Sequence, residues 1–132
     1  RNRFLFRGCN PQFTTMLLME LHEEFVMPSG IVFLVGDMAR ELYFLMSGDI
    51  ERRKEDRVIG VMYGEQDGVN MLGEVAFVMS VPQSYTAQAR MTGSATLLTL
   101  SRPAFEKLMA PYPECYEIIV GNLLEEYDMD RK

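Results

Sequence analysis

The residues best suited to chemistry lie in the segment 72–89, where a glycine and a glutamate precede a short apolar run. Gly73 allows the backbone to approach a ligand closely, and the carboxylate of Glu74 can accept hydrogen bonds from sugar hydroxyls. The next residues are apolar and predict a short helical turn: Val75, Ala76 and Phe77. The free N–H groups and positive dipole at the start of such a turn favour an anion. The pattern predicts a site for a phosphate attached to a sugar.

The predicted site lacks a positive charge. Pro82 ends the apolar turn, a strand is expected from Ser84 onward, and Gln83 stands where a bidentate guanidinium would hold a phosphate. Gln83 and Ser84 can each donate a neutral hydrogen bond. Losing the charge-assisted contact costs about 1.5–3 kcal/mol, a roughly ten- to over a hundredfold loss of affinity. The candidate ligand-binding residues are therefore Gly73, Glu74, Val75, Ala76, Gln83 and Ser84.

Three other residues affect this interpretation. The ring of Tyr85 would fill part of the pocket if it turned inward. Arg90 cannot replace the missing cation, because it follows Gln83 along the same strand at roughly 23 Å. Glu74 also has an interpretation without a ligand, since a carboxylate at a helix start can satisfy unpaired N–H groups.

Composition excludes several classes of protein. The chain has 132 residues, 48% of them apolar, and a formal net charge of −6, which argues against nucleic acid as a partner. Acidic residues interrupt the one basic cluster, 52–57, so we interpret it as a solvated hairpin tip, with a contact to another domain as the alternative. No apolar run is long enough to span a membrane. Because the chain opens on Arg1 without methionine, we expect a fragment of a longer protein.

The chain offers little for catalysis or metal binding. Cys9 and Cys115 lie near opposite ends and predict neither a zinc site nor a disulfide framework, so reduced thiols are expected. His22 is the single histidine, whereas a metal-dependent β-barrel enzyme needs several. We predict no catalytic residues, no metal and no enzyme activity.

The periodicity predicts helices at both ends of the chain. Asn10 and Pro11 indicate a helix start, and an apolar stripe continues to about His22, which predicts a helix over 9–23. Ser101 indicates the start of two C-terminal helices over 101–130, separated by prolines. Gly121 interrupts the last helix, either to permit close packing or to allow a bend.

Between the helices, segment 24–100 shows short runs of β-branched and aromatic residues separated by turns. The run 42–46 is apolar at every position and predicts a central strand buried on both faces. The turn 92–94 predicts a hairpin that joins strands 85–91 and 95–100. The predicted fold is α+β: an antiparallel, jelly-roll-like β-roll of about eight strands with flanking helices. We expect one domain over 1–132, with the candidate site over 72–89.

The segment 72–89 resembles the nucleotide-binding cassette of the cyclic nucleotide-binding domain family. Five positions match that cassette: Leu72, Gly73, Glu74, Ala76 and Ser84. Three depart from it, namely bulky Phe77, Gln83 in place of arginine and Tyr85 in place of alanine. An earlier motif of the family is also matched, by Gly36, Asp37, Ala39, the run 42–45 and Gly48.

A finer resemblance extends over nearly the whole chain. The sequence is similar to the cytoplasmic domain of plant outward-rectifying Shaker-type potassium channels in four phrases: LFRGCNPQF (5–13), LHEEFVMPSG (21–30), VPQSYTAQA (81–89) and GNLLEE (121–126). That subfamily also carries Pro-Gln in place of Pro-Arg, so Gln83 is expected as a family trait.

The resemblance implies a regulatory and assembly domain of a voltage-gated potassium channel, at the cytoplasmic face of the membrane. It also implies that residues 1–8 are the end of the linker that precedes the domain. It implies partners among the other domains and subunits of the channel, a tetramer in full length, with no nucleic acid and no membrane insertion by this segment. No cofactor is implied, although weak binding of cAMP or cGMP remains open. In the family, the last helix closes over the nucleotide as a lid.

Two alternatives remain. The domain could be a true sensor of cAMP, cGMP or another small ligand, bound through the cassette residues. It could also belong to a transcription regulator of the catabolite-activator type, which would need a helix-turn-helix after the last helix.

Overall fold

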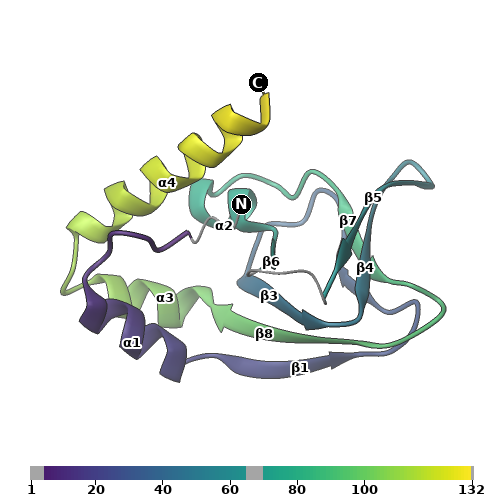
Figure 1. The fold of residues 1–132 in the computed structure, drawn as a ribbon, viewed down its shortest axis with the longest axis horizontal. Coiled ribbons are helices and arrows are strands. Elements are labelled where there is room, and N and C mark those ends of the chain that lie inside the picture. Colours follow the sequence, from purple (N-terminus) through teal and green to yellow (C-terminus); the bar gives the residue numbers. More distant parts are fainter. Residues whose placement is uncertain (1–4, 65–69, 132) are drawn as a thin grey trace.

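The computed structural model describes residues 5–64 and 70–131, and in these ranges eight strands form two antiparallel sheets with four helices gathered on one side of them (Figure 1). One sheet has the strand order β1-β8-β3-β6 and the other the order β2-β7-β4-β5. The elements are α1 (Pro11–Met19), β1 (His22–Val26), β2 (Ile31–Phe33), β3 (Glu41–Ser47), β4 (Asp49–Lys54), β5 (Arg57–Tyr63), β6 (Asn70–Leu72), α2 (Glu74–Met79), β7 (Thr86–Ala89), β8 (Ala95–Ser101), α3 (Arg102–Met109) and α4 (Glu114–Arg131). The predicted antiparallel β-roll with flanking helices is confirmed.

Local sequence signals fix several boundaries. The side chain of Asn10 accepts a hydrogen bond from the backbone nitrogen of Gln12 at 2.8 Å, and Pro11 follows as the first helical residue. Ser101 caps α3 in the same way, through the nitrogen of Ala104 at 3.2 Å. These two predicted helix starts are confirmed. They could be predicted because each cap depends only on residues that are close in sequence.

The first helix is shorter than predicted. It ends at Met19, and the chain from His22 to Val26 forms the edge strand β1, paired with β8 from His22↔Thr99 to Val26↔Ala95. The prediction of a helix over 9–23 was therefore wrong at its C-terminal end. Four of the five residues of β1 are exposed, so the strand has no alternating pattern to reveal it, and pairing with β8 decides its conformation.

The predicted hairpin around 92–94 was also wrong. Strand β7 pairs with β2 and β4, whereas β8 pairs with β1 and β3. The connection therefore crosses from one sheet to the other. Turn residues mark where the chain reverses, but they do not determine whether the flanking strands pair with each other.

Buried side chains form two clusters on opposite faces of β3. Leu42 and Phe44 face the helices, where they pack with residues of α1 to α4, while Tyr43 and Leu45 face the interior of the roll. The predicted central strand is confirmed over 42–45, which is buried on both faces, whereas Met46 is exposed. For Gly121 in α4, the sequence left close packing and a bend as alternatives. A Cβ atom at this position would meet nothing within 4 Å, so close packing does not explain this glycine.

Arg102 joins the roll to the short helix α2. Its guanidinium donates hydrogen bonds to the carbonyl of Ala39, at 3.2 and 3.1 Å, and to the carbonyl of Phe77 at 2.9 Å. It also lies 4.5 Å from the centre of the Phe77 ring. These contacts hold α2 and the residues around it in place beside the roll.

Candidate functional site

Gly73 begins the predicted cassette in a conformation that favours glycine. Its φ is +70°, and the six-residue helix α2 follows directly, with the nitrogen of Phe77 bonded to the carbonyl of Gly73 at 3.0 Å. The helix ends at Met79, followed by Ser80 in the left-handed conformation, three residues before the expected end at Pro82. In this turn Ala76 is buried, Glu74 is half-buried and Val75 is exposed.

Gln83 lies inside the protein against Gly73. Only 3% of Gln83 is exposed, and a Cβ atom on Gly73 would fall 2.6 Å from its Nε2. Its backbone nitrogen donates to the carbonyl of Asp37 at 2.8 Å, and its carbonyl accepts from Gly36 at 2.7 Å. Among the described residues, Nε2 itself has no hydrogen-bond partner. The structure thus brings Gly73 and Gln83 together, whereas Ser84 is exposed.

Tyr85 turns inward toward the same glycine. Its hydroxyl accepts a hydrogen bond from the backbone N–H of Gly73 at 3.3 Å, and its ring packs against Phe33 with 5.4 Å between ring centres. Burial raises the pKa of Tyr85 to about 12, and the charge of Glu74 acts in the same direction, partly offset by the Gly73 hydrogen bond and Arg52. Tyr85 is therefore a neutral phenol at neutral pH, and its hydroxyl contacts the backbone of Gly73.

Arg52 is a residue of this site that the sequence interpretation missed. It pairs with Ala87 on one side and Gly60 on the other, so it lies within the second sheet and away from the hairpin tip. Its guanidinium carbon is 5.8 Å from the centre of the Tyr85 ring. The prediction of a solvated hairpin tip agrees with Lys54 and Arg57, which are exposed, but it is wrong for Arg52. Alternation with buried Ile50 two residues earlier was the available signal.

Arg90 does not take the place of the missing cassette cation. Its guanidinium lies 3.9 Å from a carboxylate oxygen of Asp49 and 3.6 Å from one of Glu51. This arrangement agrees with the expectation that Arg90 cannot reach the cassette. Among the described residues, no group of three metal-ligating side chains is found either.

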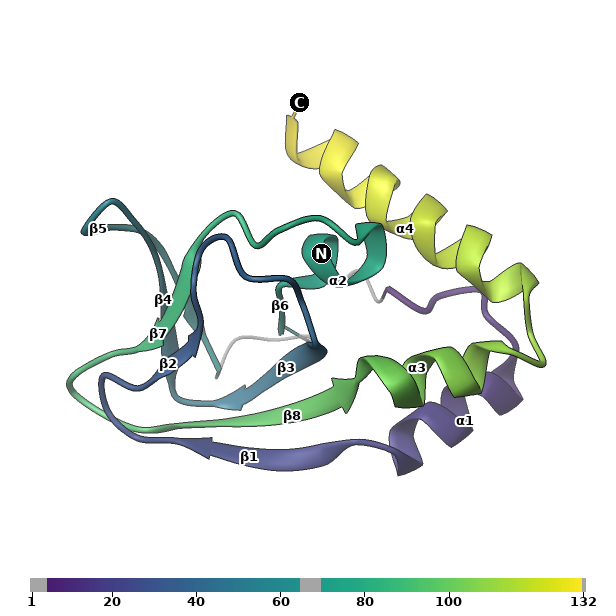
Figure 2. The same ribbon diagram turned by 180° about the vertical axis from the view of Figure 1, so that it is seen from behind.

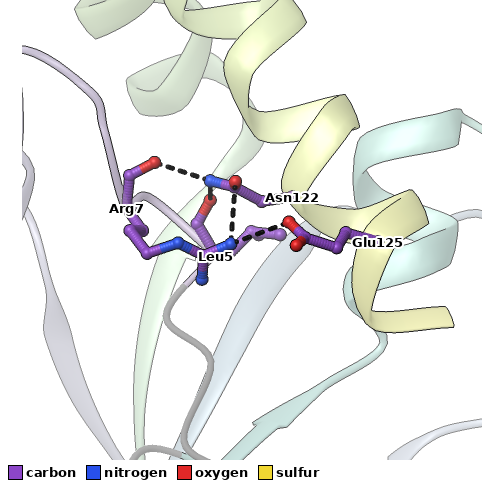
Figure 3. A network of polar contacts seen from close by, with 4 residues as sticks. All are labelled: Leu5, Arg7, Asn122 and Glu125. Atoms are coloured by element: carbon purple, nitrogen blue, oxygen red, sulfur yellow. Dashed lines mark hydrogen bonds and ion pairs between the residues drawn. The ribbon is translucent and has the colours of Figure 1, made fainter. Parts of the chain in front are cut away.

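A second polar network joins the N-terminal segment to α4 (Figure 3). The side-chain amide of Asn122 donates to the carbonyl of Leu5 at 2.8 Å and to that of Arg7 at 2.7 Å. Arg7 in turn donates to Asn122 at 3.3 Å and to the carboxylate of Glu125 at 3.1 Å. Residues 1–4 of the expected linker end lie outside the described residues. The described part of this segment, from Leu5 onward, is hydrogen-bonded to α4 through Asn122 and Glu125.

The two cysteines also lie at this junction. Cys9 and Cys115 are both buried and are not joined by a disulfide, as expected. Burial raises the pKa of the Cys9 thiol to about 12, and the neighbouring Cys115 contributes to the shift. The Cys9 thiol is therefore protonated at neutral pH, and both cysteines form part of the packing between the N-terminal segment and the start of α4.

The fold and the cassette define a class of protein. A family model described as the cyclic nucleotide-binding domain matches residues 23–112, and the chain belongs to this family. The expected resemblance to plant outward-rectifying potassium channels is confirmed as well. The chain is 27% identical over 126 residues to potassium channel SKOR of Arabidopsis thaliana, and 27% identical over 130 residues to potassium channel KOR2 of Oryza sativa subsp. japonica.

These alignments cover most of this chain but little of each relative. They include 92% and 97% of this chain, and 14% and 18% of the two channels. Among solved structures, the C-linker/CNBHD of zELK channels, crystallized in the presence of cAMP, matches with a TM-score of 0.76 at 18% identity. That match covers 92% of this chain and 60% of the other, and it supports the fold. Within the described ranges, no helix has the length and apolar character needed to cross a bilayer.

Proposed function

We propose that this chain is a regulatory and assembly domain on the cytoplasmic face of a plant-type voltage-gated potassium channel, and that it binds cyclic nucleotides weakly or not at all. The observation that carries the second part is the hydrogen bond from the Gly73 N–H to the Tyr85 hydroxyl. A phosphate bound at the cassette would need that N–H group, and the neutral phenol already uses it. The domain then acts through contacts with the rest of the channel and catalyses no reaction.

The charges around the cassette support this proposal. Gln83 supplies no cation, and Arg90 is paired with carboxylates of its own. The half-buried Glu74 adds negative charge at the start of α2, and the formal net charge of the chain is −6. Arg52 lies nearby, with its guanidinium carbon 5.8 Å from the centre of the Tyr85 ring, but no arginine stands at position 83, so a phosphodiester meets less electrostatic attraction than a cassette arginine would give.

The hydrogen bonds between the N-terminal segment and α4, here called the Asn122 clasp, support a regulatory role. Leu5 and Phe6 are buried in the core beside α4 residues, and Asn122 binds two backbone carbonyls of the segment. A displacement of α4 would thus be transmitted to the segment that precedes α1. In a full-length channel that segment would continue into the linker below the pore, and the expected neighbours are other domains and subunits of a tetramer.

Isothermal titration calorimetry with cAMP and with cGMP tests the binding part of the proposal. We expect no saturable heat at micromolar nucleotide. Micromolar affinity that disappears in Glu74→Ala would contradict the proposal and favour a true nucleotide sensor. The left-handed Gly73 and the helix α2 are the observations that favour that second candidate, since they retain the backbone shape of the cassette.

A further inference from the structure

Strand β1 forms one border of the first sheet, and its outer side pairs with no strand among the described residues. Figure 2 shows it along the lower border of the sheet, with β8 on its inner side. All five of its residues pair with β8 without a register shift, from His22↔Thr99 to Val26↔Ala95. One row of backbone N–H and C=O groups therefore remains open to a further strand.

The other border strands are shorter or irregular. Strands β2 and β6 have three residues each, and β2 also shows a register shift against β7. Strand β5 is longer, but a register shift at Arg52 and Arg53 interrupts its pairing with β4. Short strands and bulges are common means by which a sheet border avoids pairing with another chain. In the described ranges, β1 is the only border strand with neither.

Phe25 presents an uncovered aromatic ring at this border. It pairs with Thr96 of β8, which pairs in turn with Ser47 of β3, so these side chains share one face of the sheet. The helices cover the same face further along β8, where Leu98 packs against their buried residues. Phe25 lies beyond them and is 61% exposed, and Met27, just after the strand, is 64% exposed. A strand laid along β1 would therefore find an apolar contact there.

Both acidic residues of β1 lack a cation. Glu23 and Glu24 are exposed, and neither forms an ion pair in the part of the chain that the structure describes. Partial burial raises the pKa of Glu24, and the charge of Glu41 acts in the same direction. A cation placed beside Glu24 would stabilise its charged form.

These carboxylates act against pairing between two copies of the chain. In the antiparallel register that pairs all five residues of two β1 strands, the Glu24 side chains would lie directly opposite each other. Like charges at such positions are destabilising, and a formal net charge of −6 on each copy adds repulsion. A strand that carries basic residues would meet attraction instead.

We propose that the β1 edge, residues 22–27, is a docking surface for an extended segment of a partner protein that alternates basic and apolar residues and joins the first sheet as a further strand. Main-chain hydrogen bonds would hold the segment, apolar residues on one face would pack against Phe25, and basic residues on the other would meet Glu24. This inference goes beyond the proposed function, because it concerns a sheet border outside the cassette and the Asn122 clasp and names the chemistry of a partner.

Titration with a designed peptide tests the β1 edge. The probe is an acetylated peptide of about eight residues that alternates lysine and valine, added to the ¹⁵N-labelled chain. We expect saturable NMR shifts of the backbone amides of residues 22–27, and a loss of affinity of about tenfold or more in Glu24→Lys. Glu117→Lys is the matched control, because it makes the same change of charge at an exposed position on α4, and it should leave the affinity unchanged.

Altered peptides keep the test independent of whether a variant folds. Versions that are N-methylated at every lysine or at every valine keep their side chains but lose the N–H donors of one edge. At least one of these versions should bind about tenfold more weakly or worse, because a strand needs those donors to pair. A peptide that alternates glutamate and valine should not bind.

Several results would overturn the inference: no saturation with the lysine peptide, shifts confined to residues outside 22–27, equal affinity for the glutamate peptide, or unchanged affinity after both N-methylations. Dimers of the unmodified chain in sedimentation velocity that Phe25→Lys abolishes would assign the β1 edge to a second copy instead. None of these results bears on nucleotide binding, which the calorimetric titration tests separately.

Discussion

The hydroxyl of Tyr85 accepts the backbone N–H of Gly73 at 3.3 Å, so a side chain of the protein occupies the first donor of the nucleotide cassette. The family fold is retained around this contact, with Gly73 in its left-handed conformation and α2 in place. Under the function proposed above, this aromatic residue and the uncharged Gln83 beside it are what weaken cyclic nucleotide binding.

Removing both obstacles should restore nucleotide binding. In the double variant Tyr85→Ala/Gln83→Arg, the Gly73 N–H becomes available and a guanidinium returns to the cassette. A charge-assisted bidentate contact is worth about 1.5–3 kcal/mol, so we expect at least a tenfold gain in cAMP affinity over the unmodified chain by calorimetry. The single variant Gln83→Arg separates the effect of the charge from that of the ring. Equal affinities in all three proteins would show that no phosphate binds at this position.

Gly73 and Gly121 should respond oppositely to alanine. At Gly73, with φ of +70°, an L-residue costs about 1–2 kcal/mol, so Gly73→Ala should destabilise the domain by that amount. Gly121 lies in α4 with nothing within 4 Å of a Cβ atom, so Gly121→Ala should stabilise it by about 0.5–1 kcal/mol. Urea unfolding monitored by circular dichroism measures both changes. Stabilisation by Gly73→Ala would show that the cassette does not require the left-handed conformation.

The Asn122 clasp should matter more than the ion pair beside it. Asn122→Leu removes the donor to the carbonyls of Leu5 and Arg7, so residues 5–9 should exchange their amide hydrogens faster. Glu125→Gln is the control, because the Arg7 and Glu125 side chains are 45% and 58% exposed and such pairs contribute about 0–1 kcal/mol. Hydrogen exchange with mass spectrometry distinguishes the two variants. Equal exchange in both would mean that the amide does not fasten the segment.

Stability should fall in alkaline solution as the buried phenol ionises. Burial raises the pKa of Tyr85 from 10.0 to about 12, so the folded state favours the neutral form. This contribution is complete below pH 10, declines between pH 10 and 12 and is lost above, because the unfolded chain releases the proton first. Burial also raises the pKa of Tyr43 above its ordinary value. Urea unfolding across this range should show a smaller loss of stability in Tyr85→Phe, and an unchanged pH profile would contradict the burial of this hydroxyl.

Features that depend on neighbours in sequence were predicted well. The caps at Asn10 and Ser101 and the glycine before α2 follow from backbone preferences and short-range hydrogen bonds, and the strand buried on both faces follows from its continuous apolar run. The errors concern long-range pairing. An exposed edge strand such as β1 has no pattern of its own, and a turn such as 92–94 does not specify which sheet the next strand joins.

The sequence by itself determined the family and the missing cassette arginine, because Gly73, Glu74 and Gln83 are read directly at the spacing of a known motif. Only the tertiary structure decided that the Tyr85 hydroxyl turns toward Gly73 and that the Arg52 side chain lies against the Tyr85 ring. Both depend on side chains from different strands meeting in one interior. Residue type alone could not place a cation of the basic cluster inside, since a charge run is ordinarily solvated and only strand pairing assigns each residue to a face.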